Sequence, residues 1–413
     1  MRILSGGRAE ARVRRIASRG LELSVLEPKV RGIIRRVRSQ GDSAVRRYAE
    51  RWDGLGSGQS VRVSEAEIQS AWKAASRDLR ESLSTAATNI RRFCEWQRPV
   101  DWQRQRDGIL LGQMVRPLDS VACYVPAGRY PLVSTVLMTV IPAQVAGVGR
   151  ICIASPRAHP QVLAAAGMLD VREVYRIGGA QAIAALAYGT PSIPRVDKIV
   201  GPGNLFVTAA KKLVSFDCAI DFLAGPTEIV ILSSRGRAEF IAADLVAQAE
   251  HDPDALAVFI TTRADLAEEV NNVASALARQ NPAARESLGA SGSTLRAKTR
   301  RQAIEWANRI APEHITVDER DLPFIRNAGS VFVGDYSAQS AGDYASGPNH
   351  VLPTGGAARF RGGLSVLDFM KLISVQKLTA PGLRRIAGVV GTLAETEGLR
   401  AHADSVRIRC NHA

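Results

Sequence analysis

The 413-residue chain has little cysteine, no long apolar run and fewer acidic than basic side chains. Its five cysteines are scattered, odd in number and never in a CxxC pair, which predicts a reducing cytoplasm and argues against a thiolate zinc site. The most apolar stretch, LVSTVLMTVIPAQVAGV at 132–148, is broken by polar residues and proline, so we expect no membrane span. The N-terminus carries arginines without an apolar segment, so we expect no signal peptide.

The deficit of acids leaves a formal net charge of +14. A basic face is one way to bind nucleic acid. The arginines, however, are spread through helical segments that also contain acids, as in VRGIIRRVRSQGDSAVRRYAERW at 30–52, and no finger or RRM-like signature is present. We therefore expect a solvated surface, part of which could serve an anionic ligand such as a dinucleotide, and keep nucleic-acid binding as an alternative.

The spacing of apolar residues changes after about residue 120. Roughly the first 110 residues have the apolar spacing of helices, and the chain returns to helical patterns after about 365. Between them, β-rich runs alternate with helical runs. The strand–helix pairs are 120–128 with 133–147, 150–155 with 160–169, 173–178 with 179–189, 197–203 with 204–214, 228–233 with 237–251, and 256–262 with 263–280. This alternation predicts an α/β protein with parallel sheet, in more units than one compact mononucleotide-binding half contains.

Glycine clusters lie at four expected strand-to-helix turns: YVPAG, IGGAQ, VGPGN and LAGPTE. Ligands of open α/β sheets bind at the carboxyl ends of the strands. Neither GxGxxG nor GxxxxGK[ST] occurs, so a standard dinucleotide fingerprint is absent. A single glycine turn is usually only a tight turn, but four at equivalent places indicate a ligand cleft.

Gln248 and His251, in VAQAEHDPDA, lie three residues apart near the end of an expected helix and therefore on one face. They could be two zinc ligands, with Asp343 as a carboxylate ligand and a second histidine from 314, 350 or 402. The same spacing also suits an ordinary helix end, where the histidine caps carbonyls and Pro253 stops the helix. No HExxH motif is present to decide between them.

Glu313 and His314 adjoin between an expected helix and strand, in IAPEHITV. Their pKa values are of the kind that a site can tune for proton transfer near neutral pH. Adjacent residues of a strand point to opposite faces, so a shared pocket requires an irregular turn here. A hydrogen-bonded surface pair is the alternative.

Together these motifs resemble the histidinol dehydrogenase family over nearly the whole chain. The resemblance begins at VRGIIRRVRSQGDSAVRRYAERWDG, continues through YVPAGRYPLVSTVLM, GGAQAIAALAYGT, DKIVGPGN, AGPTE and DLVAQAEHDPDA, and ends with NRIAPEH, GDYASGPNHVLPT, GLSVLDF and EGLRAH. The family oxidises L-histidinol to L-histidine in two NAD-dependent steps through a bound aldehyde. Related enzymes on the same frame oxidise other polar alcohols, such as sulfonated diols, so another substrate remains an alternative.

The resemblance implies roles for individual residues. It makes Gln248, His251, Asp343 and His402 the zinc ligands, with the last donated by the other subunit of a homodimer. His314 is expected to take the alcohol proton, and Glu313 to activate the water that attacks the aldehyde. The expected substrate contacts are Thr227, Gln248, His251, His314, Asp343, Glu397 and His402. The expected NAD contacts are Tyr124, Gln181 and Asn204.

The resemblance also implies the architecture. We expect two Rossmann-like parallel-sheet domains in an intertwined homodimer, with a helical N-terminal segment and a small helical C-terminal domain. The expected parts are an N-terminal arm (1–20), a domain with most zinc and catalytic residues (21–123 with 229–364), an NAD domain (124–228) and a tail that reaches the partner subunit (365–413). Three positions depart from the family pattern: Thr227 replaces the usual serine, Ala127 a glycine and Pro348 a threonine.

Overall fold

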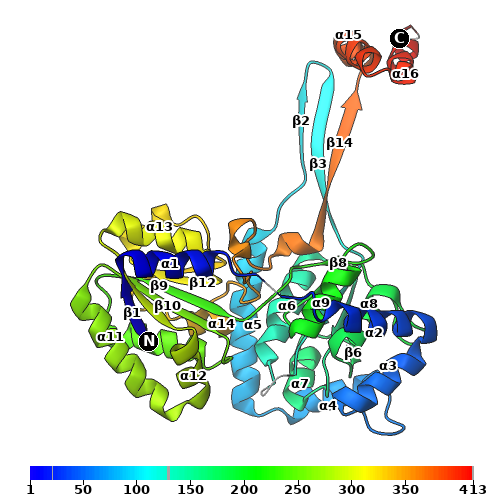
Figure 1. The fold of residues 1–413 in the computed structure, drawn as a ribbon. Helices are drawn as coiled ribbons and strands as arrows, with labels where there is room; N and C mark the ends of the chain where they lie inside the picture. The colour runs from blue at the N-terminus through cyan, green and yellow to red at the C-terminus, as the bar shows by residue number, and fades with distance from the viewer. Residues whose placement is uncertain (21, 128–130, 412–413) are drawn as a thin grey trace.

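The computed structural model describes residues 1–20, 22–127 and 131–411. Residue 21, the first of the expected zinc and catalytic domain, and residues 412–413, the last of the expected tail, lie outside the described part. Within it, the chain forms two parallel sheets and a long antiparallel arm (Figure 1).

The first sheet has six parallel strands in the order β1-β11-β10-β9-β12-β13. The strands are β1 (Arg2–Ser5), β9 (Glu228–Leu232), β10 (Leu256–Thr261), β11 (Ser293–Arg296), β12 (His314–Val317) and β13 (Ser330–Val333). Helices α1 (Gly6–Ala17) and α13 (Arg300–Ile310) share one core with it. Helices α10 (Ala238–Ala249), α11 (Ala264–Leu277) and α12 (Pro282–Ala290) share another. Both faces are thus covered, as a parallel sheet requires.

The second sheet has five parallel strands in the order β6-β5-β4-β7-β8. The strands are β4 (Ser120–Tyr124), β5 (Arg150–Ala154), β6 (Glu173–Tyr175), β7 (Lys198–Val200) and β8 (Ala219–Ile220). One core includes α4 (Glu65–Ala74), α5 (Arg77–Gln97), α6 (Val133–Ala146) and α7 (Pro160–Met168). The other includes α2 (Glu27–Gln40), α3 (Asp42–Tyr48), α8 (Gly179–Tyr188) and α9 (Leu205–Val214).

The arm consists of β2 (Trp102–Arg106), β3 (Ile109–Pro117) and β14 (Met370–Leu378), paired antiparallel in the order β14-β3-β2. It ends in helices α15 (Ala380–Thr396) and α16 (Arg400–Asn411), which pack on each other. Figure 1 shows this helical pair at the far end of the arm, away from both sheets. Strands β2 and β14 expose most of their residues to solvent, whereas most residues of β3 are partly buried.

The six predicted strand–helix pairs are confirmed, with boundaries that shift by only a few residues. The prediction of helix after about 365 is wrong for residues 370–378, which form β14. The prediction of helix over roughly the first 110 residues is also wrong for β1 and β2. A strand with little buried surface carries little of the apolar alternation by which strands are recognised, and this holds for all three.

The division of the chain into domains differs from the predicted one in its packing. Residues 21–123 were expected to group with 229–364, but α2, α3, α4 and α5 pack on the second sheet and β4 lies at its centre. The bounds of the N-terminal arm, the NAD domain and the tail stay predictions. Among the described residues, none of the helices combines the length and the apolar character needed to span a membrane.

The LAGPTE motif is not a strand-to-helix turn. It lies in the connection from β8, in the second sheet, to β9, in the first. The chain therefore passes from the carboxyl end of one sheet directly to the amino end of the other. We call residues 221–227 the crossover.

A buried ion pair fixes the start of the crossover. Asp221 accepts a hydrogen bond from the Gly201 amide (2.7 Å) and forms an ion pair with Lys211, whose ammonium also donates to the Gly201 carbonyl (3.0 Å). Both side chains are almost fully excluded from solvent. The pair thus ties the glycine turn before Asn204 to the crossover.

We expect Lys211→Met to lower the free energy of unfolding by about 3–5 kcal/mol, because it leaves Asp221 as an uncompensated buried charge. Urea denaturation of the purified protein measures this value. The neighbouring Lys212→Met is the control, since its half-exposed ion pair with Glu27 should contribute only about 0–1 kcal/mol. Equal losses in the two variants would contradict the assignment.

Candidate active site

Glu313 and His314 lie at the junction of α13 and β12. Ala311, which follows the end of α13, has a left-handed backbone with φ of 50°, and His314 is the first residue of β12. This is the irregular turn that a shared pocket required. Both side chains are buried, and both contact the start of β9.

The Glu313 carboxylate is held by its Oε2 atom. That oxygen accepts hydrogen bonds from the Thr227 hydroxyl (2.7 Å) and from the Glu228 amide (2.8 Å). The Thr227 hydroxyl in turn accepts from the Gln248 side-chain amide. The departure from serine at position 227 therefore leaves the hydroxyl in use. Among the described residues, Oε1 of Glu313 makes no hydrogen bond.

His314 lies between two carboxylates. Its Nδ1 atom is 3.2 Å from the Glu228 carbonyl and 3.6 Å from Oε2 of Glu313, and its Nε2 atom is 3.5 Å from Oδ1 of Asp343. The last distance is long for a hydrogen bond. Within the described part of the chain, Nε2 is buried and has no hydrogen-bond partner. A buried nitrogen without a partner indicates a ligand position.

Electrostatics favour the cationic form of His314. Burial lowers its pKa, but the negative charges of the neighbouring Glu313 and Asp343 outweigh burial and raise the pKa to about 10. The pKa of Asp343 is lowered, because the nearby histidines outweigh burial, which acts to raise it. Burial lowers the pKa of His350, whose Nδ1 is 2.8 Å from the Asp343 carbonyl.

Asp343 is in the last turn of the short helix α14 (Gln339–Tyr344). Gly342 permits this, because a Cβ atom there would come within 2.6 Å of the Phe332 ring. Gln248 is buried in the last turn of α10, and the exposed His251 follows the helix end, with its amide 3.4 Å from the Gln248 carbonyl. His251 is near enough to Asp343 to lower the pKa of the Asp343 carboxyl.

Three of the four predicted zinc ligands thus gather at one place: Gln248, His251 and Asp343. No group of three or more histidine, cysteine, aspartate or glutamate side chains with metal-binding geometry occurs within residues 1–20, 22–127 and 131–411. One chain offers a histidine, a carboxylate and an amide oxygen, which fits an incomplete zinc site that needs a further ligand. The intervening Glu250 binds the Asn281 side chain (2.7 Å), as befits a structural residue.

The fourth predicted ligand, His402, and the predicted substrate contact Glu397 lie elsewhere. His402 is exposed in α16, and Glu397 is exposed just after α15. Both are carried by the helical pair at the end of the arm (Figure 1). Within a single chain, the structure does not bring them to the other site residues.

The three predicted cofactor contacts line one cavity of about 710 Å³ at the carboxyl end of the second sheet. Tyr124 ends β4, and its hydroxyl accepts from the Gly179 amide (3.0 Å). Gln181 lies in the first turn of α8, and Asn204 caps the start of α9. The cavity also contacts Asp252, next to His251, so it extends towards the zinc-ligand candidates. The departure Ala127 lines the same cavity.

Comparison with known proteins shows the family of this chain. The sequence model described as histidinol dehydrogenase matches residues 17–410. The chain belongs to the histidinol dehydrogenase family. It is therefore an NAD-dependent oxidoreductase, which disfavours the nucleic-acid-binding alternative.

Individual relatives of the family cover nearly the full length. The histidinol dehydrogenase of Methanothermobacter thermautotrophicus is 48% identical over 399 residues, 93% of each chain. That of Aquifex aeolicus is 43% identical over 395 residues, 93% of this chain and 92% of the relative. The crystal structure of the Elizabethkingia anophelis histidinol dehydrogenase matches with a TM-score of 0.94 at 33% identity, over 100% of this chain and 98% of that one.

Sequence reasoning missed several residues that hold the site together. Glu228, the last residue of the AGPTE motif, contacts both Glu313 and His314. Asp53, in the WDG motif, is buried and accepts hydrogen bonds from the Gln181 side chain and the Gly178 amide, both at 3.0 Å. Burial raises the pKa of Asp53, against the lowering effect of these bonds. The motifs contained both residues, but only their contacts show what they do.

We expect Asp53→Ala to raise the KM for NAD by roughly tenfold, because the Gln181 amide loses the acceptor that orients it. The change in kcat should be smaller, since Asp53 touches neither Glu313 nor His314. Initial rates at varied NAD concentration provide the measurement. Asp42→Ala is the control, because it removes a surface carboxylate whose one partner in the described part of the chain is Ser192. An unchanged KM in Asp53→Ala would show that Gln181 does not depend on it.

Proposed function

We propose that this protein oxidises L-histidinol to L-histidine, the last step of histidine biosynthesis, in two successive NAD-dependent steps through L-histidinal. The observation that carries the proposal is the buried Nε2 atom of His314. It has no hydrogen-bond partner among the described residues and lies beside Glu313, which has a free carboxylate oxygen. A proton acceptor and a water-activating carboxylate at one place suit an alcohol oxidation followed by hydration of an aldehyde.

His314 serves the two oxidations. Its Nε2 takes the proton of the substrate hydroxyl while the carbon that bears this hydroxyl loses hydride. The carbonyl of Glu228 fixes the ring through Nδ1, which directs Nε2 towards the substrate. The same transfer then removes a proton and a hydride from the hydrated aldehyde. NAD supplies the acceptor for each hydride, and two molecules are reduced for each histidinol.

Glu313 serves the hydration between them. Its Oε1 takes a proton from water as the water oxygen bonds to the aldehyde carbon. The aldehyde oxygen takes the proton that His314 acquired in the first oxidation, which gives the hydrated form and leaves His314 free to act again. The hydrogen bonds on Oε2 keep the carboxylate in one orientation, and a fixed orientation lowers the entropic cost of the step. The burial of both residues excludes water other than the reacting molecule.

Gln248, His251 and Asp343 would hold zinc together with His402 of the partner subunit. When bound, the metal would fix the imidazole and amine of the substrate. A cation at Asp343 would also reduce the negative charge that His314 experiences, which favours the neutral imidazole that a base needs. Thr227, His314 and Glu397 complete the proposed substrate contacts.

Tyr124, Gln181 and Asn204 are the proposed NAD contacts. The cavity that they line also contains Lys29 and Arg157, and the N-termini of α8 and α9 border it. Backbone amides at helix N-termini and cationic side chains favour a pyrophosphate. This arrangement supports NAD binding without a GxGxxG motif.

The proposed assembly is a homodimer with shared active sites. The helical pair at the end of the arm exposes Val389 (61%), Leu393 (59%) and Ile408 (58%). Apolar surface of this kind favours contact with another protein surface. A second copy of the chain would cover it and receive Glu397 and His402. The enzyme is proposed to work in the cytoplasm, with histidinol as its small-molecule substrate.

The wild-type protein, loaded with zinc, should form two NADH per L-histidinol. We expect Glu313→Gln to slow the second oxidation by about 10²–10⁴-fold and to accumulate the aldehyde after one NADH, because the hydration loses its base. Absorbance at the NADH band and an aldehyde trap measure both quantities.

Glu250→Gln is the control for this experiment, since Glu250 binds only Asn281 among the described residues. A normal second oxidation in Glu313→Gln would contradict its role. If L-histidinol gave no NADH while a sulfonated diol did, the enzyme would belong to the alternative substrate class.

His251→Ala and His402→Ala should each lose zinc and activity as homodimers. Unfolding and refolding them together should restore about a quarter of the wild-type activity, because half of the random dimers would contain one intact site of two. Activity and bound zinc after mixing are the measurements. A mixture that stays inactive would contradict the shared site, and an active His402→Ala homodimer would remove His402 from the ligand set.

A further inference from the structure

Glu228 holds both members of the Glu313–His314 pair with its main chain. Its amide donates to Oε2 of Glu313 (2.8 Å), and its carbonyl lies 3.2 Å from Nδ1 of His314. The strand register explains the arrangement, because β12 pairs with β9 and His314 is opposite Ile229. Any displacement of Glu228 therefore displaces the two proton-transfer groups together.

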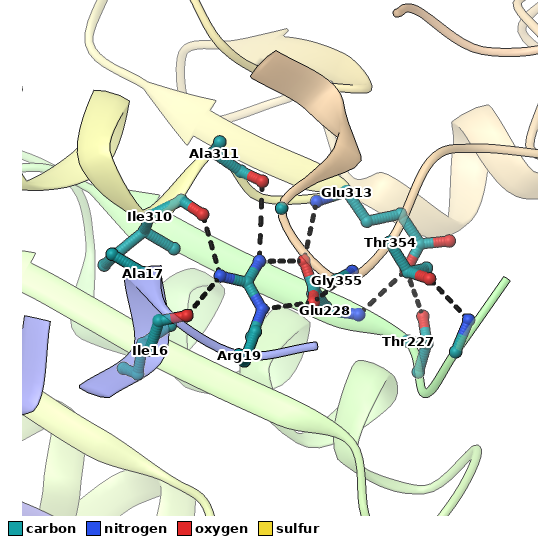
Figure 2. Close-up of polar contacts among 12 residues, drawn as sticks. Ile16, Ala17, Arg19, Thr227, Glu228, Ile310, Ala311, Glu313, Thr354 and Gly355 are labelled. Atoms are coloured by element: carbon teal, nitrogen blue, oxygen red, sulfur yellow. Dashed lines mark hydrogen bonds and ion pairs between the residues drawn. The ribbon is translucent and has the colours of Figure 1, made fainter. Parts of the chain in front are cut away.

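The Glu228 side chain is buried, with 3% exposure, and turns towards the N-terminal segment (Figure 2). Its Oε2 accepts from the Glu313 amide (3.3 Å), and its Oε1 accepts from the Gly355 amide (2.9 Å). Glu228 and Glu313 thus each donate their amide to the carboxylate of the other. Two carboxylates are thus buried in the same part of the interior, which requires a compensating cation.

Arg19 supplies that cation. Its Nε donates to Oε1 of Glu228 (2.6 Å), and its Nη2 donates to Oε2, so the guanidinium binds the carboxylate in bidentate fashion. In the part of the chain that the structure describes, no other ion pair involves Glu228. A planar fork of this kind holds the carboxylate in position as well as neutralising it.

The other donors of Arg19 fix the turn before Glu313. Its Nη1 donates to the Ile16 carbonyl (2.7 Å) and the Ile310 carbonyl (2.8 Å), and its Nη2 also approaches the Ala311 carbonyl at 3.4 Å. Ala311 is the residue with left-handed backbone that leads into Glu313. Figure 2 shows the guanidinium between the end of α1, the end of α13 and Glu228. A lysine, with one point of charge, cannot reproduce this set.

We propose that Arg19 is a positioning residue for the reaction: by clamping Glu228 and the Ile310–Ala311 turn, it holds Glu313 and His314 in their reactive orientation without touching substrate or cofactor. The inference deepens the proposed function and rests on it. It gives the N-terminal segment, which contains none of the predicted site residues, a part in the chemistry.

The test compares Arg19→Ala and Arg19→Lys with wild type in the full-length, zinc-loaded enzyme. We expect kcat for histidinol and for histidinal to fall by about 10²-fold in Arg19→Ala, because a small misplacement of reacting groups has an effect of that size. The KM values should change little. Guanidinium chloride at low millimolar concentration should restore part of kcat in Arg19→Ala, whereas methylammonium should not. Arg19→Lys keeps the charge and should fold, yet remain below wild type.

The matched control is Arg309→Ala. Arg309 joins the same two helices through an ion pair with Glu10 (2.7 Å) but does not contact Glu228. It should leave kcat near wild type. A wild-type kcat in Arg19→Ala, or an equal loss in Arg309→Ala, would overturn the inference, because the effect would then be absent or would reflect only the docking of α1.

Hydrogen exchange separates this inference from the proposed function. Amides of residues 311–317 and 227–230 should exchange faster in Arg19→Ala than in Arg309→Ala, with or without any substrate. If wild type formed no NADH from histidinol, the proposed function would fail while this readout still tested the clamp. Unchanged exchange in Arg19→Ala would overturn the inference even in an active enzyme.

Discussion

The site depends on two buried carboxylates, those of Glu228 and Glu313. Such a pair would be unstable if each group lacked donors. Each residue gives its amide to the other's carboxylate, and Arg19 neutralises one of them. These contacts need the start of β9, the start of β12 and the segment after α1 at one point. The order of strands makes β9 and β12 neighbours, and the packing of α1 on α13 brings the segment after α1 to the same point.

The crossover connects the carboxyl end of the second sheet to the amino end of the first sheet, and the site residues lie at these two ends. The cofactor candidates lie at the carboxyl end of the second sheet, as open parallel sheets favour. The proton-transfer pair lies at the amino end of the first sheet, where α10 also ends and brings Gln248. Because residues 221–227 run from one end directly to the other, the two groups of residues face a common region without a long loop.

Much of this fold was predictable from the sequence, because buried strands and their helices alternate with a strong apolar pattern. The strand from 228 to 232 is wholly buried and was predicted almost to the residue. β14 was not predicted, because in one chain most of its residues are exposed. Its role depends on the rest of the arm and, in the proposed dimer, on a second copy.

The sequence predicted the residues of the site better than the residues that hold them in position. The resemblance named Gln248, Asp343, Glu313 and Thr227, and the structure gathers them. Arg19 stands in an arginine-rich segment in which nothing distinguishes it from Arg14 or Arg15. Its importance comes from its contact with Glu228, 209 positions later in the sequence. A pattern of neighbouring residues cannot reveal a contact between residues so far apart.

That separation has a consequence for how the protein is made on the ribosome. Strand β1 is an edge strand whose only partner in the described sheet is β11, at Ser293–Arg296. The second sheet, between them in sequence, is complete well before β11 has been synthesised. The first twenty residues must therefore wait, unpaired, while a large part of the chain condenses, and long-range parallel pairing is slow. The proton-transfer site would then be among the last parts of the molecule to assemble, so a nascent chain can be largely folded and still inert.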